Sequence, residues 1–212
     1  MNHPITSVLT TVLTTELETF EPTPEEMEKR IARFKDLKPT KRNYNESNVG
    51  IPGEAYAKLA ADCVYKLMSP PGNKRAAAIP AISGNPGVEV SILDNPPGHG
   101  PRMHAHMKTI ESFLCLTGKY RVSWGSGGKY HVDLEPFDFI ALPARVFREV
   151  TNISDSRALI VAIVQGSIED TFNDVLYDPV LGEKVRAEYG DEVYDNFKNI
   201  GITFGSVWKG NA

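Results

Sequence analysis

Two histidines and a glutamate lie close enough together in the sequence to bind one metal ion. His104 and His106 are separated by a single residue, so on a β-strand both side chains leave the same face. Glu111 comes after a short turn, at the start of the next predicted strand, where its carboxylate can return beside the imidazoles. Two neutral imidazoles and one carboxylate suit a first-row divalent metal and leave positions open for water or a substrate. We therefore expect these three residues to bind Fe, Mn, Ni, Cu or Zn.

The elements that must position this group are predicted to be short β-strands. From Gly87 onward, turn clusters such as TG, GSGG and NISDS separate runs of β-branched and aromatic residues. The runs cover residues 87–93, 110–116, 119–124, 129–134, 138–142, 146–151 and 157–165. Short strands at such close, regular spacing are typical of an all-β sandwich or barrel.

Helices are predicted on both sides of these strands. The segment EPTPEEMEKRIARFKDLKPT begins with a capping box and a proline suited to a helix start, which predicts a helix over residues 24–37. An Ala-rich segment that ends at the Ser-Pro-Pro-Gly cluster of residues 69–72 predicts a second helix. Apolar spacings of three and four predict helices in residues 168–178 and 178–201.

The stretch GHGPRMHAHMKTIESFLCLTG resembles the first signature motif of the cupins. All five fixed positions of that motif match, and they are Gly98, His104, His106, Glu111 and Gly118. Five fixed residues at the right spacing, inside a run of short strands, are a far more specific signal than a histidine pair alone. The resemblance implies a small antiparallel β-barrel of the jelly-roll type in which His104, His106 and Glu111 are the metal ligands.

This resemblance also suggests how the chain is divided. It covers about residues 85–166, the expected cupin β-barrel, within one folded unit. Residues 1–84 are expected to form an N-terminal helical extension packed on the barrel, and residues 167–212 a C-terminal helical extension.

The second cupin motif matches only in part. In FDFIALPARVFREVTN, Pro143 and Asn152 agree with the family pattern. Phe137 and Arg145 replace its two glycines, and Arg148 stands where the family places its last metal-binding histidine. Arg148 therefore decides whether this chain has a working metal site.

Arg148 shares one face of its predicted strand with Val146 and Val150, and the resemblance places that face inside the barrel. A buried guanidinium needs a partner, because an unpaired buried charge costs several kcal/mol. If Glu111 is that partner, the metal site is weakened or empty. If Glu111 keeps the metal, Arg148 binds and orients an anionic substrate as a catalytic residue. In the opposite register, Arg148 would lie at the surface beside Glu149.

The resemblance implies a metal-binding cupin that acts on a small organic, anionic or enolisable substrate, and an oxygenase of the dioxygenase type is the leading expectation. A non-catalytic small-molecule-binding or sensor cupin with a weakened metal site is an alternative, and so is a cupin isomerase or lyase. Cupins often form dimers, so the resemblance also implies a homodimer.

Composition argues against several other classes of protein. The net charge of −4 and the absence of clustered Lys and Arg disfavour a nucleic-acid partner. The first residues lack a positive segment followed by an apolar one, and no stretch is apolar enough for a membrane span, so we expect a cytoplasmic protein without a membrane partner. Cys63 and Cys115 have no metal-ligand spacing and are expected to be reduced, packed thiols.

Overall fold

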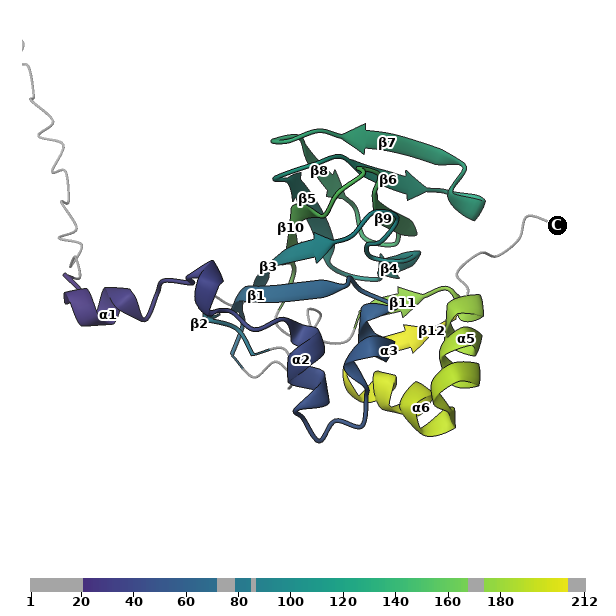
Figure 1. Cartoon of the computed structure of the whole chain (residues 1–212), viewed down its shortest axis with the longest axis horizontal. Helices are drawn as coiled ribbons and strands as arrows, with labels where there is room; N and C mark the ends of the chain where they lie inside the picture. The colour runs from purple at the N-terminus through teal and green to yellow at the C-terminus, as the bar shows by residue number, and fades with distance from the viewer. Residues whose placement is uncertain (1–20, 72–78, 85–86, 168–173, 206–212) are drawn as a thin grey trace, which may run out of the picture.

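A computed structural model describes residues 21–71, 79–84, 87–167 and 174–205. Two six-stranded sheets dominate the fold (Figure 1). Sheet A has the order β2 (Ile82–Ser83), β1 (Cys63–Ser69), β3 (Val88–Asn95), β10 (Ala158–Gln165), β5 (Ile110–Cys115) and β8 (Phe139–Leu142). Sheet B has the order β12 (Ile202–Phe204), β11 (Val175–Tyr177), β4 (His104–His106), β9 (Arg148–Asn152), β6 (Tyr120–Trp124) and β7 (Tyr130–Leu134).

The all-β fold class is confirmed, but the strands do not close into one barrel. Within the described residues, each sheet has its own two edges, and β-ladders run only inside a sheet. The two sheets are mixed, because β1 pairs with β2 and β11 pairs with β12 in parallel while the other ladders are antiparallel. The molecule is therefore a two-sheet β-sandwich with short helices beside it.

The core lies between the two sheets because side chains alternate along each strand. Along β3, β5, β9 and β10, every second residue is buried. The fully buried apolar side chains include Phe113, Tyr120, Val122, Val150 and Ile160. The inner faces are thus mostly apolar, although charged side chains are buried among them, including Lys66, Glu89, Glu111 and Arg148.

The seven strands predicted from residue 87 onward are all present, as β3, β5, β6, β7, β8, β9 and β10. Between β3 and β5, the histidine pair lies on the additional strand β4. Cys115 is buried and Cys63 is partly buried, and both thiols are free. No helix in the described part of the chain is long and apolar enough to cross a lipid bilayer.

Predictions for the flanking segments were only partly right. The capping box of Thr23 and Glu26 is confirmed, but helix α1 covers only Pro24–Glu28, and a 3₁₀ turn follows at Phe34–Asp36. The C-terminal helices are present as α5 (Pro179–Tyr189) and α6 (Asp191–Asn199), beside β12 (Figure 1).

Two segments predicted as helix are strands. Helix α2 (Thr40–Asn45) precedes the Ala-rich segment and α3 (Gly53–Ala57) covers only its start, while the part just before residue 69 is β1. The predicted helix over residues 168–178 contains β11, and its first six residues lie outside the described part. Both strands gain backbone hydrogen bonds by joining a sheet, which outweighs the local helical spacing. The extensions are therefore not purely helical, whereas the division into three segments stays a prediction.

The two positions where the second cupin motif has glycine keep a glycine-like backbone. Phe137 has φ 76° and Arg145 has φ 68°, in the left-handed region that side chains disfavour. Phe137 is 80% exposed, so its ring adds little packing that would offset this strain. We expect Phe137→Gly to raise the free energy of unfolding by about 1 kcal/mol.

Urea denaturation measures this effect, and Phe137→Ala is the matched control because it removes the ring but keeps the Cβ atom. A glycine variant no more stable than the alanine variant would show that the backbone at Phe137 is not strained.

Candidate metal centre

Strands from both sheets bring the predicted site residues together. β4 of sheet B carries His104 and His106, and β5 of sheet A carries Glu111 on its inner face. Arg148 begins β9 and lies opposite His104 in the β4–β9 ladder. All four side chains are buried between the sheets. The structure thus brings the four residues predicted for one site close together.

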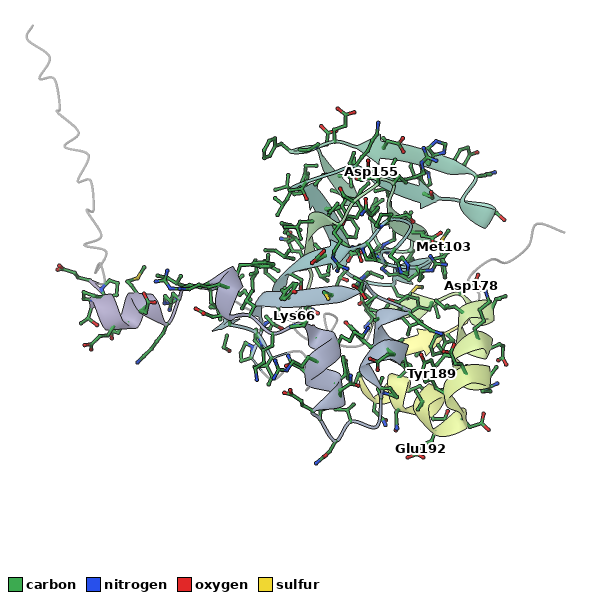
Figure 2. The ribbon with its side chains drawn as sticks, viewed as in Figure 1. Lys66, Met103, Asp155, Asp178, Tyr189 and Glu192 are labelled. Carbon is green, nitrogen blue, oxygen red and sulfur yellow. The ribbon has the colours of Figure 1, made fainter. Side chains whose placement is uncertain are left out.

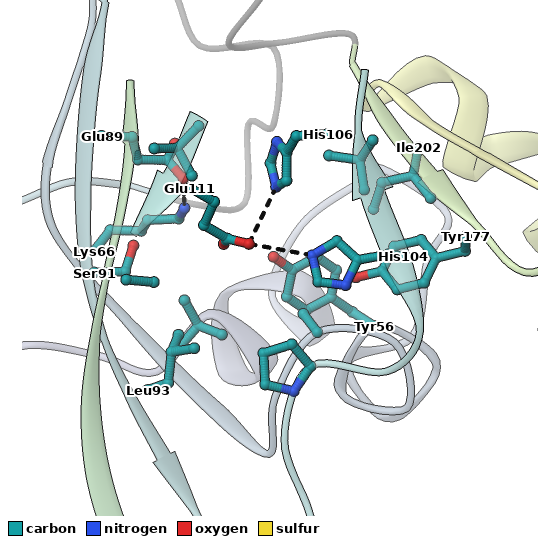
Figure 3. A pocket seen from close by; sticks show the side chains of 16 residues that line it. Tyr56, Lys66, Glu89, Ser91, Leu93, His104, His106, Glu111, Tyr177 and Ile202 are labelled. Carbon is teal, nitrogen blue, oxygen red and sulfur yellow. Dashed lines mark hydrogen bonds and ion pairs between the residues drawn. The ribbon is translucent and has the colours of Figure 1, made fainter. Parts of the chain in front are cut away.

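The three expected metal ligands converge on one carboxylate oxygen (Figure 3). The Nε2 atoms of His104 and His106 lie 3.4 Å and 3.7 Å from Oε2 of Glu111. One ligand atom from each of the three residues can be chosen so that all lie within 4.8 Å of one another. This group of one carboxylate and two imidazoles could hold a metal ion.

Hydrogen bonds at the far side of each ring determine which nitrogen carries the proton. Nδ1 of His104 lies 2.6 Å from the carbonyl oxygen of Arg102, which only accepts. Nδ1 of His106 lies 3.0 Å from Oδ1 of Asp174. Each Nδ1 therefore donates, and in the neutral ring Nε2 is left with a lone pair. Burial, and next the positive charge of Arg148, lower the pKa of His104 to about 4, so this ring is neutral at pH 7.

The Nε2 atoms of both rings face the carboxylate of Glu111. Burial alone would raise the pKa of Glu111, but the positive charge of Arg148 holds that pKa well below its ordinary value. The carboxylate is therefore charged. Two ligand atoms on one first-row metal ion lie about 3.0–3.4 Å apart when each is about 2.1 Å from the ion. The observed separations from Glu111 need only small shifts to reach this range, so a divalent cation fits the donor set.

Arg148 points inward, and its partner is Glu111. Its side chain is fully buried, with Nη2 at 2.5 Å and Nε at 3.2 Å from Oε2 of Glu111, and Nη1 at 3.1 Å from the carbonyl oxygen of Val146. The surface placement that the opposite register would give is therefore wrong. Of the two inward partners expected, the structure shows the glutamate. Because both guanidinium bonds go to Oε2, Arg148 competes with a metal ion for the same oxygen.

Two supporting residues were not predicted from the sequence. Asp174 holds His106, and it in turn accepts hydrogen bonds from the backbone N–H of Thr109 at 2.8 Å and its hydroxyl at 2.6 Å. Tyr177 stacks on His104 with ring centroids 5.1 Å apart. Asp174 directly precedes β11 and Tyr177 is its last residue, and this strand pairs with β4. They lie about seventy residues further along the chain than the histidines, in a segment predicted as helix, so no local pattern could have found them.

Asp174 should contribute to metal affinity although it lies behind a ligand. A carboxylate that accepts from the distal nitrogen of a metal-bound histidine fixes the ring and makes it more basic, and its loss costs about 10- to 100-fold in affinity. We expect Asp174→Asn to weaken metal binding by that factor, measured by competition with a chromophoric chelator. Asp178→Asn is the control, because that carboxylate caps α5 and touches neither histidine. Equal affinity in the two variants would contradict this role.

A small cavity of about 70 Å³ adjoins the centre. His104, His106 and Glu111 line it together with apolar residues of both sheets. Lys66 and Glu89 line it as well, from β1 and β3. Arg148 is not among the lining residues, because it lies behind Glu111. A ligand in this cavity would meet the histidines, the glutamate and Lys66.

No protein-family model matches the sequence, and no curated protein matches it. Among solved structures, the chain is similar to a protein from Bacillus halodurans, with 15% identity over 37% of this chain and 62% of the other, and a TM-score of 0.35. It is similar to a cupin protein from Bacteroides fragilis, with 24% identity over 40% and 70% of the two chains and a TM-score of 0.36. It is also similar to a sugar phosphate isomerase from a cupin superfamily from Silicibacter pomeroyi, with 18% identity over 52% and 63% and a TM-score of 0.39.

The match spans less than two thirds of the Bacillus and Silicibacter chains. At these identities and TM-scores, no argument about function rests on the likeness.

Proposed function

We propose that the chain is a metal-dependent cupin that acts on a small anionic or enolisable organic molecule, with oxygenation as the leading reaction class. One observation carries the proposal. Two buried imidazole nitrogens and one charged carboxylate oxygen converge on a point that adjoins a cavity. A set of two histidines and one carboxylate with open positions is typical of non-haem iron(II) oxygenases.

The residues of the chain have separate tasks in this proposal. A bound metal would supply Lewis acidity and a binding position for dioxygen or substrate oxygen. His104 and His106 present fixed lone pairs because Arg102 and Asp174 hold their other nitrogens. The apolar walls of the cavity exclude bulk water, which strengthens every charge interaction inside it.

A second candidate is a binding or sensor protein that works without a metal. The pairing of Arg148 with Glu111 favours it, since the guanidinium already neutralises the carboxylate. Isomerases and lyases would use the same centre as an oxygenase, so a reaction assay has to separate them.

Metal content per chain separates the two main candidates. Elemental analysis of protein purified without a tag or chelator should give close to one iron, manganese, nickel, copper or zinc per chain. Oxygen consumption with small oxo and hydroxy acids then tests the oxygenase, and product analysis without oxygen tests isomerisation or lyase activity. A protein that stays metal-free after incubation with each of these ions would leave only the binding candidate.

We also propose that the chain forms a homodimer through the outer face of sheet A. One apolar row crosses five strands of this face in register, and it consists of Tyr65, Ile92, Val161, Leu114 and Phe139. The outer face of sheet B is polar in the corresponding rows, which contain Asp133, Arg121, Thr151, His131, Ser123 and Glu149. An apolar face this continuous is uncommon on a monomer, and a flat sheet can pack against its own copy around a twofold axis.

Light scattering after size exclusion tests the dimer. The wild type should have twice the chain mass, and Val161→Lys should be a monomer, because the ammonium would be buried unpaired in the interface. Ser123→Lys places the same charge on the outer face of sheet B and should remain a dimer. A monomeric wild type would overturn the proposal, and so would a dimeric Val161→Lys.

A further inference from the structure

A second pair of opposite charges is buried in the wall of the cavity, away from the metal centre. Lys66 on β1 (Figure 2) and Glu89 on β3 form an ion pair with side chains only 4% and 5% exposed, and Figure 3 shows both residues. Ser69 donates to the other carboxylate oxygen of Glu89 at 3.4 Å. Neither charged residue belongs to the metal-binding group.

Stability alone does not account for this pair. Removing two charges from water costs several kcal/mol per ion, and exchanging a buried pair for apolar residues is often neutral or stabilising. Apolar side chains fill the neighbouring positions of the same wall, which are Val64, Leu93, Ala162 and Val164. A charged pair in such a wall indicates a ligand that needs it.

The pair and the metal centre lie at two ends of one wall. In sheet A, Glu89 is in register with Val164 of β10, and Val164 is in register with Glu111 of β5. Two strand spacings place the glutamate backbones about 10 Å apart. Figure 3 shows Lys66 and Glu89 on one side of Glu111 and the two histidines on the other. The cavity is therefore polar at both ends, with an apolar stretch between them.

We propose that Lys66, oriented by Glu89, binds a carboxylate at the far end of the substrate, while an oxygen group at the near end binds at the metal centre. The substrate class is then a short organic acid with an oxygen donor at each end, such as a dicarboxylate or an oxo acid. This inference rests on the proposed function and specifies its substrate.

The charges of the cavity favour a carboxylate over a phosphate at the far end. Among the described residues that line the cavity, Lys66 is the one Lys or Arg. The positive charge of Lys66 already interacts with Glu89. It therefore balances the single negative charge of a carboxylate better than the higher negative charge of a phosphate. The small volume also favours the planar, compact group.

Calorimetric titration of metal-loaded protein with dicarboxylates tests the proposal. Malonate, succinate and glutarate are each compared with the monocarboxylate of the same carbon number, namely propionate, butyrate and valerate. The wild type should bind at least one dicarboxylate about tenfold or more tightly than its monocarboxylate, because a second charge-assisted hydrogen bond forms at Lys66.

Two double variants make the test specific. Lys66→Met with Glu89→Leu removes both members of the ion pair together, so it should fold and keep its metal while losing the preference for the dicarboxylate. Lys58→Met with Glu188→Leu removes an exposed pair and should keep that preference. A Glu89→Gln variant should bind the dicarboxylate several-fold more tightly, because Lys66 no longer shares its charge; a purely structural role predicts no such gain.

The outcomes separate this inference from the proposed function. A wild type without any preference, or a Lys66/Glu89 double variant that keeps it, overturns the role of Lys66 while metal content still supports the metal centre. If the protein binds no metal, the proposed function fails, and the titrations are repeated on the metal-free protein. A Lys66-dependent preference there would support the Lys66 assignment, and its absence would overturn it.

Discussion

Replacing Arg148 with methionine should destabilise the metal-free protein by about 3–5 kcal/mol, because Glu111 would be left as a buried, unpaired carboxylate. Addition of manganese or zinc should restore much of this loss. In the variant, a metal ion no longer competes with a guanidinium for Oε2, so metal affinity should rise about tenfold or more. Urea denaturation with and without metal measures both effects, since ligand binding to the folded state adds directly to its stability.

The effect of Arg148→Met should depend on pH with a definite sign. The folded pKa of Glu111 lies below its unfolded value, so the stabilisation from its pair with Arg148 is complete above the unfolded pKa. That stabilisation is lost as the pH falls through the lowered folded pKa. The difference between wild type and variant should therefore be largest near neutrality and shrink in acid.

Arg121→Met is the matched control for Arg148→Met. Arg121 also pairs with a carboxylate, that of Asp133, but its side chain is 41% exposed. Its loss should leave both the free energy of unfolding and the metal affinity close to their wild-type values. If Arg148→Met behaves like Arg121→Met, the buried pair is not what stabilises Glu111.

Alanine at His104 should abolish metal retention. The ring supplies one of three protein ligands, and losing one ligand should weaken binding on the order of a hundredfold or more. His106→Ala should have the same effect, and the metal content of either purified variant should fall close to zero. Elemental analysis and chelator competition measure the two quantities.

His131→Ala provides the control for the histidine variants. His131 is exposed on β7, and its removal should leave metal content at the wild-type value. Metal retained by His104→Ala but lost from His131→Ala would place the ion elsewhere and refute the assignment of the centre.

Much of the centre could be predicted because its ligands are local in the sequence. His104, His106 and Glu111 lie within eight residues, and the alternation on β4 and β5 brings them to facing inner surfaces. The strands from residue 87 onward were also predictable, since they are runs of β-branched and aromatic residues separated by turn clusters.

What could not be predicted depends on contacts between distant segments. A lysine at position 66 argues against an inward-facing strand unless Glu89 is known to lie beside it. Asp174 and Tyr177 reach the histidines only because β11 joins β4. For Arg148, the sequence left two inward partners open, and only the position of the Glu111 carboxylate in space distinguishes them.

The pairing of β11 with β4 also has a consequence for biosynthesis. All three metal ligands have left the ribosome well before Asp174 and Tyr177 are made, so a nascent chain that ends at β10 has the ligands without the groups that hold the imidazoles. Under the proposed function, high metal affinity therefore arises late, once β11 has added to the sheet. An incomplete chain would bind its metal weakly, which couples metal acquisition to completion of the fold.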